Sequence, residues 1–237
     1  MGKKIECYLD CVSPYSFHAF TYLRKNAAVL ASHGVEIEYI PVFLGGINVG
    51  SGQQQTPPTL PAKARYTKYD GEQAQRYFGH TFEVPSFFPI LSLLPQRALT
   101  YIKQSHPSKL EPAFLACVEA MWYRHIDISN PENLYTALAA HHSVFSNEAE
   151  IKEIIAAAGT PEIKVRLTET TARVVEDQGA FGCPWFWVVN GDKGRAEPFF
   201  GSDRFHYMWD FLELPRVHLR LLEGKVEEEQ GKVNAKL

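Results

Sequence analysis

The chain has 237 residues but only four cysteines, and no two of them form a C-x-x-C pair. A disulfide framework and a dithiol redox motif are therefore not expected, and no cysteine and histidine cluster has the spacing of a zinc site. No run of about 18 apolar residues exists, which argues against a membrane-spanning helix. A net charge of −3 gives no basic surface for nucleic acid. We expect neither a metal, nor a membrane, nor a nucleic-acid partner.

The beginning of the chain alternates between apolar and polar residues and then changes to helical spacing. Strands are predicted over 4–10 and 35–42, with a helix over 14–32 between them. A strand–helix–strand unit of this kind implies a parallel pair of strands. A loop rich in Gly, Gln and Pro is expected over 44–58.

Every periodic segment from 60 to about 178 is helical, and strand character returns only after Pro184. The predicted helices span 63–78, 94–104, 110–124, 132–141, 148–158 and 162–177. Strands are expected at 185–189 and 197–200, joined by a hairpin turn at Asn190-Gly191-Asp192. Ser202-Asp203 is expected to cap a last helix that runs through Phe211.

This order predicts an α/β protein with a thioredoxin-like fold (βαβ…ββα) and a large all-helical domain inserted between the second and third strands. The thioredoxin-like domain would comprise 1–59 and 179–222, and the helical insert 60–178. The polar segment 223–237 would be a disordered tail.

Ser13-Pro14-Tyr15-Ser16 lies between the first strand and the first helix. Ser13 suits the N-cap, and Pro14 suits the first helical position, where an N–H is not needed. Such a helix start directs free N–H groups and the positive end of the helix dipole at one point, which suits a thiolate. An ordinary capped helix is the alternative interpretation of this tetrapeptide.

Two later segments are expected to lie near that helix start, since ligands gather at the carboxyl ends of parallel strands. Pro184 would open a strand, and the backbone of Cys183 would be free to pair with an extended peptide. An ordinary turn proline that opens a strand is the alternative interpretation. The hydroxyl, N–H groups and carboxylate of Ser202-Asp203 suit an α-amino-acid head group, although a plain helix cap explains them too.

Four separated motifs together resemble one known family. The Tyr-x-Asp strand before Ser-Pro-Tyr-Ser, Leu60-Pro61-Ala62-Lys63, Gly179 to Pro184 and Phe200 to Arg204 are similar to those of kappa-class glutathione transferases. The chain is similarly close to bacterial 2-hydroxychromene-2-carboxylate isomerases and more distantly to disulfide oxidases of the DsbA type. Ser13 and Ser16 stand where the oxidases have their two cysteines.

This resemblance implies glutathione as co-substrate, no metal, a small electrophilic substrate and a homodimer. The Ser13 hydroxyl would hydrogen-bond the glutathione sulfur as the catalytic group. The implied glutathione-binding residues are Ser13, Pro14, Tyr15, Gln53 or Gln55, Lys63, Cys183, Pro184, Ser202 and Asp203. The two glutamines are alternatives for the Asn of a Gly-Asn-x-Pro-Pro loop, and the family often has an aliphatic residue where this chain has Cys183.

We therefore expect a glutathione transferase that activates the thiol as thiolate at a helix N-terminus. A glutathione-dependent isomerase and a non-catalytic thioredoxin-fold binding protein remain alternatives, and an oxidoreductase acting through Cys11 or Cys183 is a weaker one. Aromatic residues of the insert (Phe87, Phe88, Trp122, Tyr123) would wall the electrophile pocket, if they are not simply core. Ala235-Lys236-Leu237 resembles the Ser-Lys-Leu peroxisomal signal, so peroxisome and cytoplasm both stay open. Mitochondria are less expected, because the first residues show no long Arg-rich transit segment.

Overall fold

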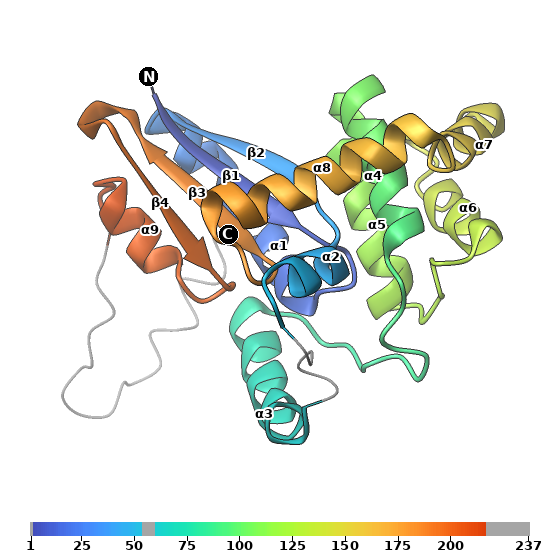
Figure 1. Ribbon diagram of the computed structural model, residues 1–237, viewed down its shortest axis with the longest axis horizontal. Helices are drawn as coiled ribbons and strands as arrows, with labels where there is room; N and C mark the ends of the chain where they lie inside the picture. Colours follow the sequence, from blue (N-terminus) through green and yellow to red (C-terminus); the bar gives the residue numbers. More distant parts are fainter. Residues whose placement is uncertain (1, 54–59, 217–237) are drawn as a thin grey trace, which may run out of the picture.

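A mixed four-stranded sheet lies at the centre of the computed structural model, which describes residues 2–53 and 60–216 (Figure 1). The strands lie in the order β2-β1-β3-β4. β1 (Lys3–Leu9) runs parallel to β2 (Val35–Pro41), whereas β3 (Trp185–Asn190) is antiparallel to both β1 and β4 (Arg195–Phe200). The predicted thioredoxin-like α/β fold is confirmed. Gln55, the tail over 223–237 and the C-terminal tripeptide lie outside the described residues.

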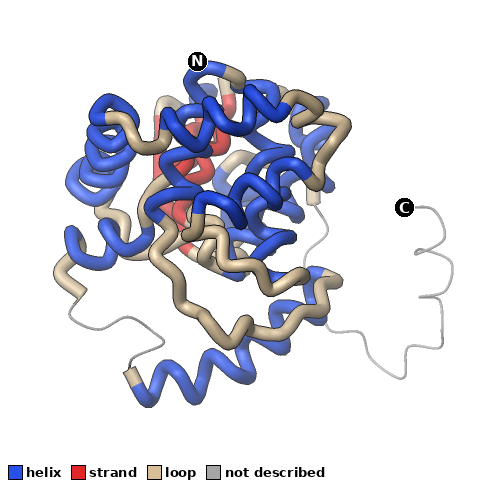
Figure 2. The backbone as a smooth tube through the Cα atoms, turned by 90° about the vertical axis from the view of Figure 1, so that its right-hand side faces the viewer, coloured by secondary structure: helices blue, strands red, loops and turns tan. Residues whose placement is uncertain are grey.

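Both faces of this sheet are covered by helices, and Figure 2 shows the strands enclosed among them. α1 (Pro14–Ser32) and α9 (Phe205–Phe211) pack on the face that carries Ile5 and Phe186. The other face, which includes Tyr8 and Trp185, packs against α2 (Leu44–Gly50) and α8 (Pro161–Gln178). β1 is thus buried on both sides, and both Tyr8 and Asp10, which directly follows the strand, are buried.

The insert between β2 and β3 is helical throughout, as expected. Its helices are α3 (Pro61–Phe78), α4 (Leu93–Ser105), α5 (Leu110–Trp122), α6 (Pro131–Ala139), α7 (Glu148–Ala157) and α8, with a short 3₁₀ turn at Pro107–Lys109. α4 and α5 share one core with α1, where Phe20 and Phe114 lie with ring centroids 4.7 Å apart. α3 has no buried residue and lies apart from the other insert helices in Figure 1.

Two expectations about local structure are wrong. The segment predicted as a loop over 44–58 begins with α2, because its glycines allow close packing on α8: a Cβ at Gly46 would lie 3.0 Å from Thr171 Cγ2. Ser202-Asp203 does not cap the last helix, since α9 begins at Phe205 and its N-cap, Arg204, makes no side-chain capping bond. The hairpin between β3 and β4 is confirmed, with a 3₁₀ turn at Gly191–Lys193.

Candidate functional site

The turn that joins β1 to α1 is shaped by the hydroxyl group of Ser13. Ser13 has an extended backbone (φ −89°, ψ 118°), and its Oγ accepts a hydrogen bond from Ser16 N at 3.2 Å, which confirms the predicted N-cap with Pro14 following it. The same hydroxyl donates to the backbone carbonyl of Cys183 at 3.2 Å, across 170 residues of sequence. Ser13 is 4% exposed, so the hydroxyl is held in place at the opening of α1.

The three segments that were expected to converge do meet here. Ser13 contacts Cys183, and Gly201 N donates to the Pro184 carbonyl at 3.1 Å. The Cys183–Pro184 peptide bond is cis. Gly201 has a φ of +90°, and a Cβ there would lie 2.8 Å from Asp203 Oδ1, so only glycine fits this loop without strain.

Cys183 presents its backbone to the site and its thiol to the core. Among the described residues no group accepts a hydrogen bond from the Cys183 N–H, which leaves a donor beside Ser13. Its side chain packs with Ile40, Val42 and Ile47 beneath α2. Burial, and then the negative charge of Asp10, hold the pKa of this thiol well above its ordinary value. Cys183 is thus poorly suited to thiol chemistry.

The remaining cysteines are equally unsuited to a redox role. Cys7, Cys11 and Cys117 are all buried, and no disulfide joins any of the four. Burial raises the pKa of Cys7 and Cys11 well above the ordinary thiol value. Since the thiolate is the reactive form, these thiols are largely inert near neutral pH.

The side-chain amide of Gln53 is bonded within the protein and does not point into the site. Its side-chain amide donates to the carbonyl of Phe181, and its backbone N–H donates to Asn48 O at 2.9 Å. The residue therefore ties the end of α2 to the loop that precedes Cys183. Gln55, the alternative residue, lies outside the part of the chain that the structure describes.

α3 covers the start of α1 through a pair of tyrosines that sequence reasoning did not connect. Tyr15 and Tyr66 donate their hydroxyls to the two oxygens of Asp70, the latter at 3.1 Å. Burial, then Asp70 and Asp203, raise the pKa of Tyr15, so Asp203 lies near this pair. Lys63 lies exposed on the first turn of α3. Asp70 could have been suspected only from the i, i+4 spacing with Tyr66.

Ser202 and Asp203 occupy the loop before α9, in different environments. Ser202 is 3% exposed, whereas Asp203 is exposed and pairs with the neighbouring Arg204. The loop thus carries a buried hydroxyl beside an exposed carboxylate, and neither residue caps α9 as the sequence suggested.

A buried polar side chain from the insert supports the turn from behind. Gln96 of α4 donates to the carbonyls of Leu9 and Val42 at 2.8 and 2.6 Å and accepts from Cys11 N at 3.3 Å. It therefore links the ends of β1 and β2 to the insert. No local sequence signal identifies such a residue, because its partners lie more than fifty residues away.

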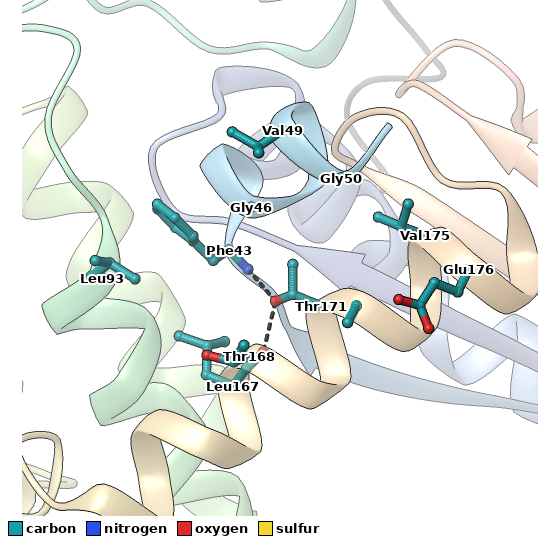
Figure 3. A pocket seen from close by; sticks show the side chains of 11 residues that line it. Phe43, Gly46, Val49, Gly50, Leu93, Leu167, Thr168, Thr171, Val175 and Glu176 are labelled. Atoms are coloured by element: carbon teal, nitrogen blue, oxygen red, sulfur yellow. Dashed lines mark hydrogen bonds between the residues drawn. The ribbon is translucent and has the colours of Figure 1, made fainter. Parts of the chain in front are cut away.

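An apolar groove of about 270 Å³ lies between α2 and α8 (Figure 3). In Figure 3, Thr171 Oγ1 accepts from Phe43 N and donates to Leu167 O, so the polar groups at its base are satisfied. None of the predicted glutathione-binding residues that the structure describes lines this groove. Its wall includes Phe43, Val49, Leu93, Leu167, Val175 and Glu176.

The aromatic residues of the insert are mostly core. Trp122 is 1% exposed, packs on Phe82 and Phe88, and donates its indole N–H to Cys11 O at 3.2 Å. Tyr123 is exposed, and its hydroxyl forms a hydrogen bond of 2.8 Å with His80 Nδ1. Trp122 thus supports the back of the Ser13 turn, whereas Phe87 and Phe88 are half-buried and Tyr123 is exposed.

Residues 2–53 and 60–216 contain neither a metal-binding cluster nor a membrane-spanning helix. Within these ranges, no group of three or more His, Cys, Asp or Glu side chains is placed to hold a metal ion. None of the helices described there is both long and apolar enough to cross a membrane.

Residues 4–213 match the family model of the DsbA-like thioredoxin domain. The chain belongs to the DsbA-like thioredoxin family. It is 28% identical over 221 residues to glutathione S-transferase kappa 1 of Homo sapiens, covering 90% of this chain and 92% of that protein. Glutathione S-transferase kappa 1 of Caenorhabditis elegans is 27% identical over 226 residues, covering 90% and 92%. The predicted resemblance to the kappa class is confirmed.

Solved structures of this family share the fold. A 2-hydroxychromene-2-carboxylate isomerase superposes with a TM-score of 0.69 at 18% identity, covering 89% of this chain and 94% of its own. The cytosolic disulfide reductase DsbM from Pseudomonas aeruginosa with GSH has a TM-score of 0.60 at 15% identity, covering 89% and 97%. At these identities the likeness supports the fold alone.

Proposed function

We propose that this protein is a glutathione transferase that binds glutathione at the opening of α1 and holds its thiol as the thiolate. The observation that carries the proposal is the convergence of the Ser13 hydroxyl with the backbone of Cys183 and the Gly201 loop. The names of the kappa-class relatives, which match over about nine-tenths of each chain, support the same conclusion.

Donors for the sulfur come from the backbone and from one hydroxyl. Tyr15 N belongs to the first turn of α1 and so has no acceptor within the helix. Ser13 Oγ would turn its proton from Cys183 O to the sulfur when glutathione binds. The Cys183 N–H, which donates to no described residue, would pair with the cysteinyl carbonyl, as in the addition of a strand. With the helix dipole, these donors favour the charged thiolate over the thiol.

The ends of the tripeptide would bind charged and polar side chains around the turn. Ser202 and Asp203 would hold the γ-glutamyl amino and carboxylate groups, and Lys63 of α3 would meet the glycyl carboxylate. Pro14, Pro184 and Tyr15 would line the turn, with Tyr15 oriented by Asp70. Gln53 would act indirectly, since its amide is bonded to Phe181 O.

The chemical step needs no group of the protein to change its oxidation state. The thiolate sulfur attacks an electrophilic carbon, forms a carbon–sulfur bond and displaces the leaving group with its electron pair. The same thiolate can add reversibly to a carbon during an isomerisation, which keeps the isomerase as the alternative. The buried, high-pKa cysteines argue against the oxidoreductase.

The direct test is turnover of glutathione with aryl halides, hydroperoxides and hydroxychromene acids by the purified protein. We expect Ser13→Ala to lower kcat/KM by about 10- to 100-fold, the loss that one charge-assisted hydrogen bond produces. Thr160→Ala is the matched control, because it removes the N-cap of α8 away from the site. Equal activity of Ser13→Ala and Thr160→Ala would remove Ser13 from the mechanism. Tight peptide binding without glutathione binding would favour a non-catalytic binding protein.

A further inference from the structure

A buried carboxylate that the proposed mechanism does not use lies at the base of the Ser13 turn. Asp10 is 0% exposed. Its Oδ1 accepts from Val12 N at 3.0 Å, and its backbone carbonyl accepts from Ser13 N at 3.0 Å. Its own N–H donates to Ser16 Oγ at 3.4 Å. Asp10 is thus bonded to both ends of the tetrapeptide that opens α1.

The second carboxylate oxygen joins two other parts of the molecule. Oδ2 accepts from Leu44 N, at the start of α2, at 2.8 Å, and from the hydroxyl of Ser92, before α4, at 2.7 Å. Among the described residues no Lys, Arg or His forms an ion pair with Asp10. The charge is therefore stabilised by neutral donors alone, which offset only part of its lost hydration.

The neutral form of Asp10 fits the same surroundings. Two of its three side-chain partners are backbone N–H groups, which can only donate. Ser92 is a hydroxyl, which can accept a proton from the acid as well as donate one to the carboxylate. Burial raises the pKa of Asp10 to about 6, against the lowering effect of these three hydrogen bonds. Both protonation states are thus accessible near neutral pH.

Asp10 lies beside the place proposed for the sulfur, because it is bonded to Val12, Ser13 and Ser16 of the turn. Its negative charge also contributes, after burial, to the raised pKa of the nearby thiols of Cys11 and Cys183. The raised pKa values of Cys11 and Cys183 keep both of these thiols neutral near pH 7. Two negative charges at a buried turn raise each other's proton affinity, so Asp10 and a bound thiolate titrate as a coupled pair.

We propose that the donors of the turn make the bound glutathione thiol a stronger acid than Asp10, so that Asp10 takes up a proton as the thiol loses one and the occupied turn carries a single negative charge, on the sulfur. The S–H bond breaks with its electron pair left on sulfur, an O–H bond forms at Asp10 Oδ2, and solvent relays the proton. Asp10 acts through the turn without touching glutathione. This inference rests on the proposed function and deepens it.

Calorimetry of glutathione binding in buffers of different ionisation enthalpy tests the inference, because it counts the protons released. Near pH 7 we expect the wild type to release close to none, while the ultraviolet absorbance of the thiolate appears. Asp10→Asn cannot take up the proton, so the number of protons that this variant releases to the buffer on binding glutathione should be higher by up to about one per site. Glu38→Gln is the matched control, since Glu38 is a partly buried carboxylate paired with Lys4 and Lys103, and its proton count should equal that of the wild type.

A second variant covers the case in which Asp10→Asn fails to fold, since its amide would face a backbone N–H. Ser92→Ala keeps the carboxylate and removes one of the hydrogen bonds that lower its pKa, so the pH below which glutathione binding releases a proton should move upward relative to the wild type. A full proton released by the wild type together with thiolate absorbance refutes the inference and leaves the proposed function intact. Binding without thiolate absorbance, or no binding heat at all, refutes both.

Discussion

Replacing Ser13 by alanine removes both hydrogen bonds of one hydroxyl group, the bond from Ser16 N and the bond to Cys183 O, each 3.2 Å long. Loss of an N-cap serine costs about 1 kcal/mol. A buried carbonyl left without its partner costs about 1–2 kcal/mol more. We therefore expect Ser13→Ala to lower the free energy of unfolding by about 2–3 kcal/mol without glutathione.

Urea unfolding followed by tryptophan fluorescence measures this change, because Trp122 and Trp185 are buried. Thr160→Ala removes an exposed cap whose bond to Ile163 N is 3.4 Å long and should cost about 1 kcal/mol or less. Ser13→Thr keeps the hydroxyl and should cost less than about 1 kcal/mol.

The losses in the free energy of unfolding of Ser13→Ala and Thr160→Ala, compared with each other, test whether the bond to the Cys183 carbonyl contributes to stability. If Ser13→Ala is no more destabilising than Thr160→Ala, the hydroxyl contributes only a cap. The bond to the Cys183 carbonyl would then be absent in solution, and the convergence on which the site is built would be wrong.

Three further predictions concern a histidine, a glycine and the cysteines. Burial, then His80, lower the pKa of His18 to about 4, so its neutral form stabilises the fold and that stability is lost as pH falls from about 6.5 through 4. As pH falls across this window, the free energy of unfolding of His18→Phe, measured in urea, should rise by about 3 kcal/mol relative to that of the wild type. The two proteins are compared because the raised pKa of Asp10 stabilises both of them as pH falls, in the opposite sense to His18. The same pH dependence in both proteins would contradict the prediction. Gly201→Ala should destabilise by about 1–3 kcal/mol because of its φ of +90°, whereas Gly71→Ala, in a helix with open space, should stabilise slightly; similar effects would contradict the loop geometry. Alkylation counted by mass spectrometry should label none of the four thiols in the native protein but all four in urea, and rapid native labelling of Cys183 would show that its thiol faces the site.

The sequence was sufficient to predict the parts of the site that depend on local rules. Ser13 and Pro14 obey the preferences of a helix start, and the structure has them there. The rule that ligands gather at the carboxyl ends of parallel strands brought Cys183 and the Gly201 loop to the same place. The first inference succeeds because capping is decided by a few neighbouring residues, and the second because the order of strands and helices along the chain restricts the topology.

The parts that were missed depend on contacts between distant segments. Gly45 and Gly46 disfavour a helix locally, yet packing on Thr171 stabilises α2. Gln96 is an ordinary polar helix residue until its three backbone partners surround it. Asp10 looked like the polar side of a strand because periodicity cannot show that β1 is covered on both faces.

The pKa of the glutathione thiol in the complex tests the central claim most directly. A pH titration of thiolate absorbance with the protein in excess over glutathione gives this value. We expect it to lie at least about one unit below the ordinary thiol value of about 8.5, and to rise towards that value in Ser13→Ala. A bound thiol that titrates at its ordinary value in the wild type would contradict the account.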